Sequence, residues 1–191
     1  MCAVQQDQAL VAKIYHHPTD THGHKLAAML AHPLMEPWAT PQHILAVWPL
    51  DLLCPVDRSQ RVVGFLMPRI TGMVSIIRFY NPGTRRQERP WFDYYRLHHT
   101  ARNLAVAVQT LHTRGYVIAD VNTANTYVGD DARVTLIDTD SFQVRDPQNG
   151  RIYRCLVGTP EYTPREMQGR DFASVDRAPA HDYFGLAVLI F

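Results

Sequence analysis

The sequence has 191 residues, 46% of them hydrophobic and 10% aromatic, so it predicts a globular protein with a buried core. A formal net charge of +1 argues against a general electrostatic hold on nucleic acid. No apolar run approaches the roughly 20 residues of a membrane span, and the N-terminus has no secretory signal pattern. The three cysteines are scattered and lack C-x-x-C spacing, which fits a reducing cytoplasm. We therefore expect a cytoplasmic protein with no membrane span and no direct nucleic-acid binding by this segment.

The first β-prone run, at 10–15, reads LVAKIY and carries one lysine. An amine inside an apolar strand is costly unless it has a partner, so Lys13 is either an edge residue that reaches solvent or a functional cation. Residues 19–30 follow with N-cap candidates and with apolar residues at helical spacing. The sequence therefore predicts a strand that contains Lys13 and then a helix.

Two further strands are predicted after a proline-rich connector at 33–41. Apolar runs at 44–53 and 61–69 lie on either side of a polar turn at 57–60, a pattern typical of two strands joined by a turn. By composition alone, the second run is a core strand that Pro68 ends.

The clearest helix signal covers 91–114, where apolar residues recur on one face and Gly115 stands at the C-cap position. A charged stretch, GTRRQERP, precedes it at 83–90, and we interpret this stretch as a solvated loop. The alternative is that its arginines contact a partner or a phosphate. At the far end, the apolar residues 185–191 predict a buried helix.

The stretch at 116–142 combines two apolar strand-like runs with polar residues at their ends. A polar turn at 129–131 joins the two runs. Asp120 precedes Asn125 by five positions, and Asp138 closes the second run. A carboxylate that accepts a hydroxyl proton, with an amide and a second carboxylate that hold a metal ion, is the minimum set for phosphoryl transfer. The alternative is a plain hairpin with solvated polar residues at its ends.

This pattern resembles the catalytic loop and metal-binding segment of protein kinases, in which D-x-x-x-x-N is followed by an Asp at the end of a strand. Residues 158–166, GTPEYTPRE, resemble the end of a kinase activation segment, and 181–186, HDYFGL, resemble the Asp-led start of the large C-lobe helix. The runs VAKIYH, GFLMPRI, LIDTDSFQV and VGTPEYTPRE are similar to a bacterial Ser/Thr-type kinase-like group that is often joined to helix-hairpin-helix DNA-binding segments. No helix-hairpin-helix pattern occurs in this sequence.

The resemblance implies an α+β fold of the two-lobed protein-kinase-like type, truncated at both ends. Residues 1–70 would form a partial N-lobe, and residues 71–191 a partial C-lobe with the catalytic loop, metal-binding segment and activation segment. No glycine-rich loop precedes the lysine strand, and kinase C-lobe helices would continue past Phe191. We therefore expect the chain to be a fragment of a longer protein.

The resemblance also implies a role for each polar residue of the pattern. Asp120 would be the catalytic base that accepts the proton of a substrate hydroxyl. Asn125 and Asp138 would hold Mg2+ beside the phosphates of ATP. Lys13, at the position of the kinase V-A-I-K lysine, would be a catalytic and ATP-binding residue that steadies the α- and β-phosphates.

Supporting residues follow from the same resemblance. Phe65 and Met67 lie in the run that would lead to the hinge between the lobes, and they would offer apolar surface to the adenine ring. Glu166 would have a structural role in an ion pair with an arginine of the C-lobe. Asp182 would cap its helix and accept hydrogen bonds from the backbone of the catalytic loop.

The sequence departs from the kinase pattern in four places near these residues, the first being Ile118-Ala119 where kinases usually have His-Arg before the catalytic Asp. The predicted helix has no glutamate to pair with the strand lysine, and His22, His24 or Lys25 takes that place. Asn122 replaces the lysine that neutralises the γ-phosphate. The D-F-G triplet reads D-T-D, and its second carboxylate, Asp140, either helps to bind metal or raises local repulsion.

Together these features predict an ATP- and Mg2+-dependent phosphotransferase that acts on Ser or Thr hydroxyls of a protein substrate, with the protein itself as one candidate. The alternative is a pseudokinase that binds nucleotide, or serves as a scaffold, without catalysis. The retained set of Lys13, Asp120, Asn125 and Asp138 favours the first hypothesis, and the departures favour the second. The 191-residue chain by itself is expected to be inactive.

Overall fold

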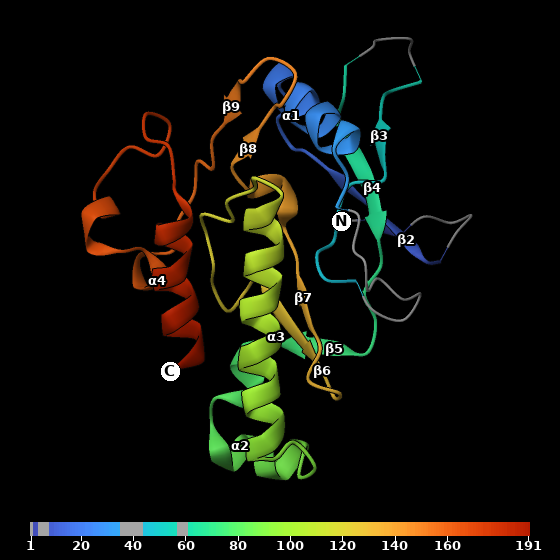
Figure 1. The fold of residues 1–191 in the computed structure, drawn as a ribbon. Coiled ribbons are helices and arrows are strands. Elements are labelled where there is room, and N and C mark those ends of the chain that lie inside the picture. The colour runs from blue at the N-terminus through green and yellow to red at the C-terminus, as the bar shows by residue number, and fades with distance from the viewer. Residues whose placement is uncertain (1, 4–7, 35–43, 57–60) are drawn as a thin grey trace.

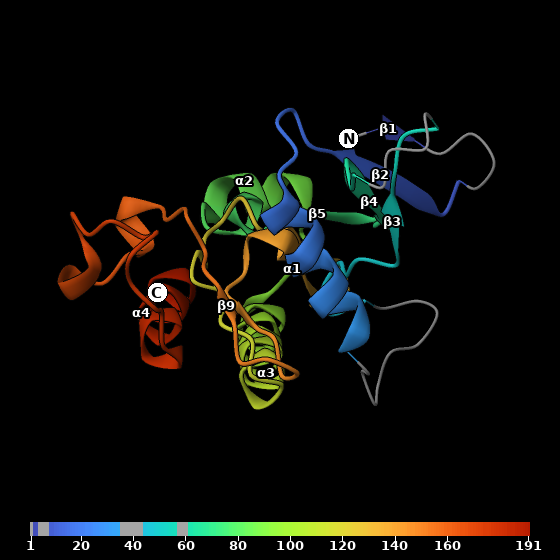
Figure 2. The same cartoon turned by 90° about the horizontal axis from the view of Figure 1, so that it is seen from above.

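A computed structural model describes residues 2–3, 8–34, 44–56 and 61–191, the first two by their backbone. The described residues form a mixed α+β structure of four α-helices and three small antiparallel sheets. In Figure 1 and, turned by 90°, in Figure 2, the sheet of the first strands lies on one side, and helices α3 and α4 lie on the other. Within the described ranges, no helix is both long and apolar enough to cross a membrane.

The first sheet holds the predicted lysine strand next to the predicted hinge strand. Its strands are, in spatial order, β1 (Cys2–Ala3), β2 (Leu10–Ile14), β4 (Gly64–Pro68) and β3 (Asp51–Leu53). Lys13 of β2 lies directly opposite Phe65 of β4. Gly64 permits this close pairing, because a Cβ there would lie 2.1 Å from the carbonyl oxygen of Lys13. The strands predicted at 10–15 and 61–69 are confirmed with shorter bounds.

Helix α1 (Asp20–Ala31) confirms the predicted helix after β2. Thr19 begins it through a capping box, in which its hydroxyl accepts the N–H of His22 at 3.3 Å and its own N–H donates to His22 Nδ1 at 3.1 Å. The helix packs against β3 and β8. Trp48 ties it down further, because its indole N–H donates to the carbonyl oxygen of Met29 at 3.1 Å.

The sequence predicts one strand over 44–53, but in the structure only residues 51–53 of this run form a strand, β3. Ala46 instead pairs in parallel with Leu136 of the second sheet. The N–H of Val47 donates to Leu136, and the N–H of Leu136 donates to Leu45, each at 2.8 Å. An isolated apolar run does not reveal which sheet its backbone joins, so this long-range pairing was not predicted. The predicted turn at 57–60 and most of the connector at 33–41 lie outside the described residues.

The stretch predicted as a charged loop forms a helix, so that prediction was wrong. Helix α2 (Pro82–Glu88) follows the short 3-10 helix η1 (Ile76–Phe79). The Asn81 side chain accepts the N–H groups of Gly83 at 2.8 Å and Thr84 at 3.2 Å, and Pro82 occupies the first turn. An asparagine cap and a proline at the first helical position favour a helix start despite the charged composition.

Helix α3 (Tyr94–Thr113) is the predicted long helix, and its N-cap is Asp93. It packs on the second sheet, which consists of β5 (Met73–Ser75), β6 (Thr126–Gly129) and β7 (Val134–Leu136). Strands β6 and β7 are the predicted hairpin around the turn at 129–131. A third, two-stranded sheet pairs β8 (Val144–Arg145) with β9 (Ile152–Tyr153).

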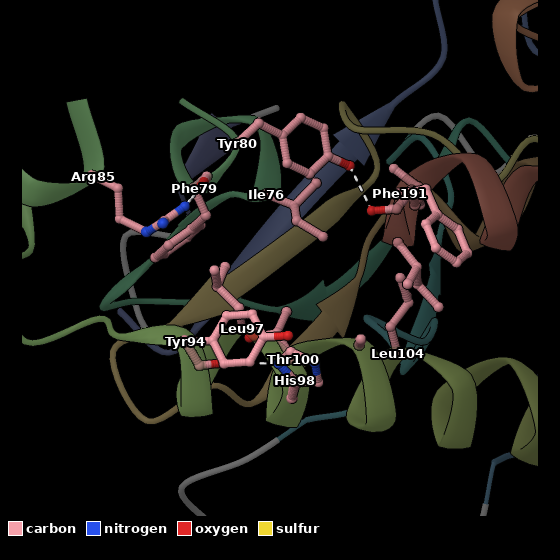
Figure 3. A pocket seen from close by; sticks show the side chains of 13 residues that line it. Ile76, Phe79, Tyr80, Arg85, Tyr94, Leu97, His98, Thr100, Leu104 and Phe191 are labelled. Carbon is pink, nitrogen blue, oxygen red and sulfur yellow. Dashed lines mark hydrogen bonds between the residues drawn. The ribbon is translucent and has the colours of Figure 1, made fainter. Parts of the chain in front are cut away.

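Helix α4 (Pro179–Ile190) is buried along one side rather than all round, in contrast to the prediction. Asp182, Gly185 and Leu189 are buried, whereas neighbours such as Phe184 and Ile190 are exposed. A cavity of about 550 Å³ is lined by residues of η1, α2, α3 and the end of α4, and Figure 3 shows their side chains. None of the predicted catalytic or metal-binding residues lines this cavity.

Candidate active site

The fold brings Lys13 and two carboxylates together from opposite ends of the sequence. Lys13 Nζ lies 2.5 Å from Asp138 Oδ1 and 2.6 Å from Asp140 Oδ1. Lys13 comes from β2, and the carboxylates belong to the short 3-10 turn η2 (Thr139–Ser141) and the residue before it. The structure therefore gives Asp140, the second carboxylate of the D-T-D triplet, a contact that the sequence did not predict, since Asp140 is a partner of the strand lysine.

The two carboxylates differ in their surroundings. Asp140 has 8% of its side chain exposed, and its second oxygen accepts the hydroxyl of Tyr15 at 2.9 Å. Asp138 has 38% of its side chain exposed. Its backbone lies in the left-handed region with φ of 61°, a strained conformation for a residue with a Cβ that is found often at functional sites. We refer to Lys13, Asp138, Asp140 and Tyr15 as the lysine–carboxylate cluster.

Charge and burial shift the pKa of Lys13 in opposite directions and the pKa of Tyr15 in the same direction. Burial alone would lower the pKa of Lys13, but Asp140 and Asp138 outweigh it and raise that pKa above its usual value. Burial, then the charge of Asp140, raises the pKa of Tyr15. Lys13 is therefore a cation and Tyr15 a neutral donor at physiological pH.

The buried charged residue of helix α1 is a lysine and not a carboxylate. Lys25 is 8% exposed, and burial lowers its pKa to about 8, although the charges of Cys155, Asp140 and Asp138 oppose the shift. His22 instead stacks on Tyr15 with 4.4 Å between ring centroids. Of the three residues expected at the glutamate position, Lys25 is thus the one that is buried.

The loop 118–125, the expected catalytic loop, is ordered by its own side chains. Asn122 Oδ1 accepts the N–H groups of Ala124 at 2.8 Å and Asn125 at 3.0 Å. Asn122 Nδ2 donates to the hydroxyl of Thr159 at 3.1 Å. The N–H of Thr159 donates in turn to Asp120 Oδ1 at 2.8 Å. Asn122 therefore shapes the loop and joins it to the segment after Gly158.

Asp182 holds the other end of this loop, as the sequence predicted. Its carboxylate accepts the N–H groups of Ile118 at 2.8 Å and Ala119 at 2.7 Å, and His112 Nε2 lies 2.8 Å away. Ala119 has a φ of 65°, so its backbone needs such support to stay in the left-handed region. Asp182 is 1% exposed, and its charge is compensated by these donors.

Sequence reasoning missed Arg177, which supports the same loop from the opposite side. Its buried guanidinium donates to the carbonyl oxygens of Ala119 at 2.5 Å and Val157 at 3.0 Å. The guanidinium carbon lies 3.8 Å from the centroid of the Phe172 ring. No motif contains Arg177, so only the contacts reveal it.

Asn125 and Asp138 lie at the same end of the β6–β7 hairpin. The N–H of Ile137 donates to the carbonyl oxygen of Asn125 at 2.9 Å, and Asp138 directly follows Ile137 in the chain. An amide oxygen and a carboxylate suit Mg2+, which takes few protein oxygens and completes its shell with water and phosphate. Among the described residues no group of three or more His, Cys, Asp or Glu side chains forms a metal cluster.

A cavity of about 230 Å³ opens beside the lysine–carboxylate cluster. Its walls are mostly apolar and are formed by Val11, Lys13, Val47, Met67, Pro68, Arg69, Ile70, Tyr127, Ile137, Asp138 and Asp140. Met67 lines the cavity as expected for an adenine contact. Phe65 does not, because it is 1% exposed in the core, with Lys13 Nζ 6.0 Å from its ring centroid. The sequence did not point to Val11 or Tyr127 as wall residues.

Glu166 has no ion-pair partner among the described residues, and the sequence left open whether its arginine belongs to this chain. It lies in the 3-10 turn η4 (Arg165–Met167) and is exposed. No salt bridge of the described ranges includes Glu166, so the expected ion pair with an arginine is not formed there.

Comparison with known proteins relates this chain to a protein kinase. No protein-family model matches the chain. The sequence is 41% identical over 184 residues to "Protein kinase YegI" of Escherichia coli O157:H7, and equally so to the protein of that name from Escherichia coli strain K12. The aligned region covers 95% of this chain but 27% of each relative, so the chain spans about a quarter of the length of the proteins it matches.

Proposed function

We propose that this chain is part of a cytoplasmic protein kinase of the Ser/Thr type, which uses ATP and Mg2+ to phosphorylate a hydroxyl of a protein. Residues 1–70 and 71–191 would be partial N- and C-lobes of a two-lobed kinase-like fold. One observation carries the proposal: Lys13 and Asp138, 125 positions apart, meet at 2.5 Å beside a mostly apolar cavity. The relation to a protein kinase supports it further.

The cavity suits the adenine base of ATP, and the lysine–carboxylate cluster suits its phosphates. Val11, Met67 and Tyr127 offer apolar surface for a flat base, which such pockets typically bind. Lys13 is charged and lies at the same cavity, where it would bind the α- and β-phosphates. Asn125 and Asp138 would hold Mg2+, which neutralises charge on the phosphates during transfer.

Asp120 is the residue that we assign as the general base. Its Oδ1 accepts the N–H of Thr159 at 2.8 Å, which fixes the orientation of the carboxylate. Its Oδ2 would then receive the proton of the substrate hydroxyl. Asp182 and Arg177 would act as positioning residues, since both bind the backbone immediately before Asp120.

Asn122 favours a second candidate function, a nucleotide-binding module without catalysis. A lysine at this position would place a cation near the γ-phosphate, whereas the Asn122 side chain is engaged by the loop itself and by Thr159. The reaction would then lack one source of charge neutralisation. ATP binding without phosphate transfer would support this function.

The test uses the full-length protein, purified with Asp120→Ala and Asp138→Ala variants. Each is incubated with γ-labelled ATP and Mg2+, and label transfer and nucleotide-induced thermal shift are both measured. Asp130→Ala serves as the control, because Asp130 is an exposed carboxylate on the β6–β7 turn. Transfer that only the Asp120 and Asp138 variants lose is the expected result. A Mg2+-dependent shift without transfer would indicate the second function, and the absence of both signals in the wild type would overturn the proposal.

A further inference from the structure

We infer that the two carboxylates of the lysine–carboxylate cluster have different duties toward Lys13. Asp140 is its permanent anchor and positions Lys13 for the phosphates. Asp138 is an exchangeable partner that leaves Lys13 when nucleotide and Mg2+ bind. The inference rests on the proposed function and names the residue that replaces the missing helix glutamate.

The anchor role follows from the contacts and burial of Asp140. One oxygen binds Lys13 Nζ at 2.6 Å and the other accepts the Tyr15 hydroxyl at 2.9 Å, so both oxygens are used, by Lys13 of β2 and by the residue that directly follows this strand. The side chain is 8% exposed, and a part-buried charge-assisted pair of this kind is costly to break. Asp140 also lines the cavity, but both of its oxygens are engaged, so it is less free than Asp138 to release Lys13 or to take up a metal ion.

The backbone around Asp140 is also fixed in place. The Thr139 hydroxyl donates to the carbonyl oxygen of Val47 at 2.6 Å, and Thr139 is 1% exposed. The Ser141 hydroxyl donates to the carbonyl oxygen of Asp138 at 2.8 Å. These bonds hold η2 on both sides of Asp140, so the anchor belongs to a rigid turn rather than to a mobile side chain.

The exchangeable role follows from the position of Asp138. Its side chain is 38% exposed, and it lines the proposed nucleotide cavity. One oxygen, Oδ1, binds Lys13 at 2.5 Å. An ion pair with this much solvent access contributes little net stability, so a Mg2+ ion that approaches with phosphates can replace it. Lys13 then stays paired with Asp140, and its remaining N–H groups donate to the phosphates.

Helix α1 takes no part in holding Lys13. Its only acidic residue is Asp20, in the first turn, and the residue buried toward the cluster is Lys25. Lys13 and Lys25 are the only lysines among the 191 residues. Helix α1 therefore supplies no carboxylate to Lys13, and its His22 contacts the cluster through the stack on Tyr15.

The test compares Asp140→Asn with Asp138→Asn in the full-length protein, with KM for ATP, kcat and the Mg2+ requirement measured separately. Asp140→Asn is expected to raise KM roughly tenfold to a hundredfold, because a charged hydrogen bond is lost, at an unchanged Mg2+ requirement. Asp138→Asn is expected to lower kcat and to raise the Mg2+ requirement. Asp130→Asn is the matched exposed control and should change neither.

Two further variants protect the test against simple misfolding. Asp140→Glu should recover part of the KM effect, and Tyr15→Phe, which leaves both carboxylates in place, should raise KM by a few-fold at the same Mg2+ requirement. Affinity for a non-hydrolysable ATP analogue with Mg2+, measured by calorimetry, gives the same comparison if the wild type transfers no phosphate. An Asp140→Asn protein with unchanged nucleotide affinity would overturn the inference. A Mg2+ requirement that rises in Asp140→Asn as it does in Asp138→Asn would also overturn the inference, since Asp140 would then be a metal ligand.

Discussion

The buried amine of Lys25 predicts that a single substitution stabilises the protein in a pH-dependent way. We consider Lys25→Met, which keeps a long unbranched side chain and removes the charge. Burial lowers the pKa of Lys25 from 10.5 to about 8. At about 1.4 kcal/mol per pKa unit, this shift corresponds to roughly 3 kcal/mol of the free energy of unfolding.

The sign of the effect follows from the protons bound in each state. Below pH 8 the amine of Lys25 is charged in both states, and the folded protein bears the full cost of burying that charge. Between pH 8 and 10.5 the folded protein has released the proton while the unfolded chain still holds it, so stability rises with pH. Above 10.5 both states are neutral and the cost is gone. Lys25→Met should therefore be more stable than the wild type by roughly 3 kcal/mol at pH 7, and this gain should shrink between pH 8 and 10.5.

Urea unfolding followed by circular dichroism at several pH values measures the difference between variant and wild type. Ala27→Met is the control, because Ala27 is exposed on the same helix, and its effect should be small and independent of pH. A difference that stays constant from pH 7 to 11 would refute the reasoning. A loss of stability at pH 7 would also refute it, since the amine would then have a buried partner that the charge requires.

Three other substitutions test single contacts. Asp182→Ala leaves two buried N–H groups of the expected catalytic loop without an acceptor, and should lower the free energy of unfolding by about 3 kcal/mol or more in urea titration. Gly64→Ala places a Cβ 2.1 Å from the carbonyl oxygen of Lys13, so it should separate β2 from β4 and lower the melting temperature by several degrees. Gly150→Ala, at a turn with open space around the glycine, should lower the free energy of unfolding by only about 1 kcal/mol. Asn122→Lys removes the bonds of Asn122 to Thr159 and to the loop N–H groups of Ala124 and Asn125 but supplies a cation, and a higher kcat is expected because the phosphate then gains charge neutralisation. An unchanged kcat in a variant that still binds ATP would count against that explanation of the departure.

Local patterns predicted the parts of the fold that local interactions determine. The helix after Thr19, the long helix after Asp93 and the hairpin over β6 and β7 all follow from caps, periodicity and a polar turn. The loop predicted at 83–90 was wrong for a local reason as well, because the cap formed by Asn81 and Pro82 starts a helix that the charged composition does not indicate. Residues 44–48 could not be placed, because their partners in β7 are about 90 positions away.

In the candidate site, too, sequence motifs predicted some contacts, whereas others depend on long-range packing. Asp182 was predicted correctly to bind the backbone of the loop at 118–125, because it belongs to a motif with a recognisable duty. The pairing of Lys13 with Asp140 was not predicted, since two nearby carboxylates are equivalent in sequence and differ only in burial and in the second donor, Tyr15. Arg177 lies outside every motif, so its role needs coordinates.

Residues 45–47 have a consequence for how the chain can be divided. They belong to the first part of the sequence, yet they are 2–3% exposed and hydrogen-bond to β7 of the second part. One continuous apolar core also includes residues from both sides of position 70. We therefore expect the two proposed lobes to unfold as one cooperative unit, because each would expose its part of this shared core if it were separated. Pieces 1–70 and 71–191, expressed together, are therefore expected to reassemble as a complementing pair, and neither alone should show protected amides at Val47 or Leu136 in hydrogen exchange.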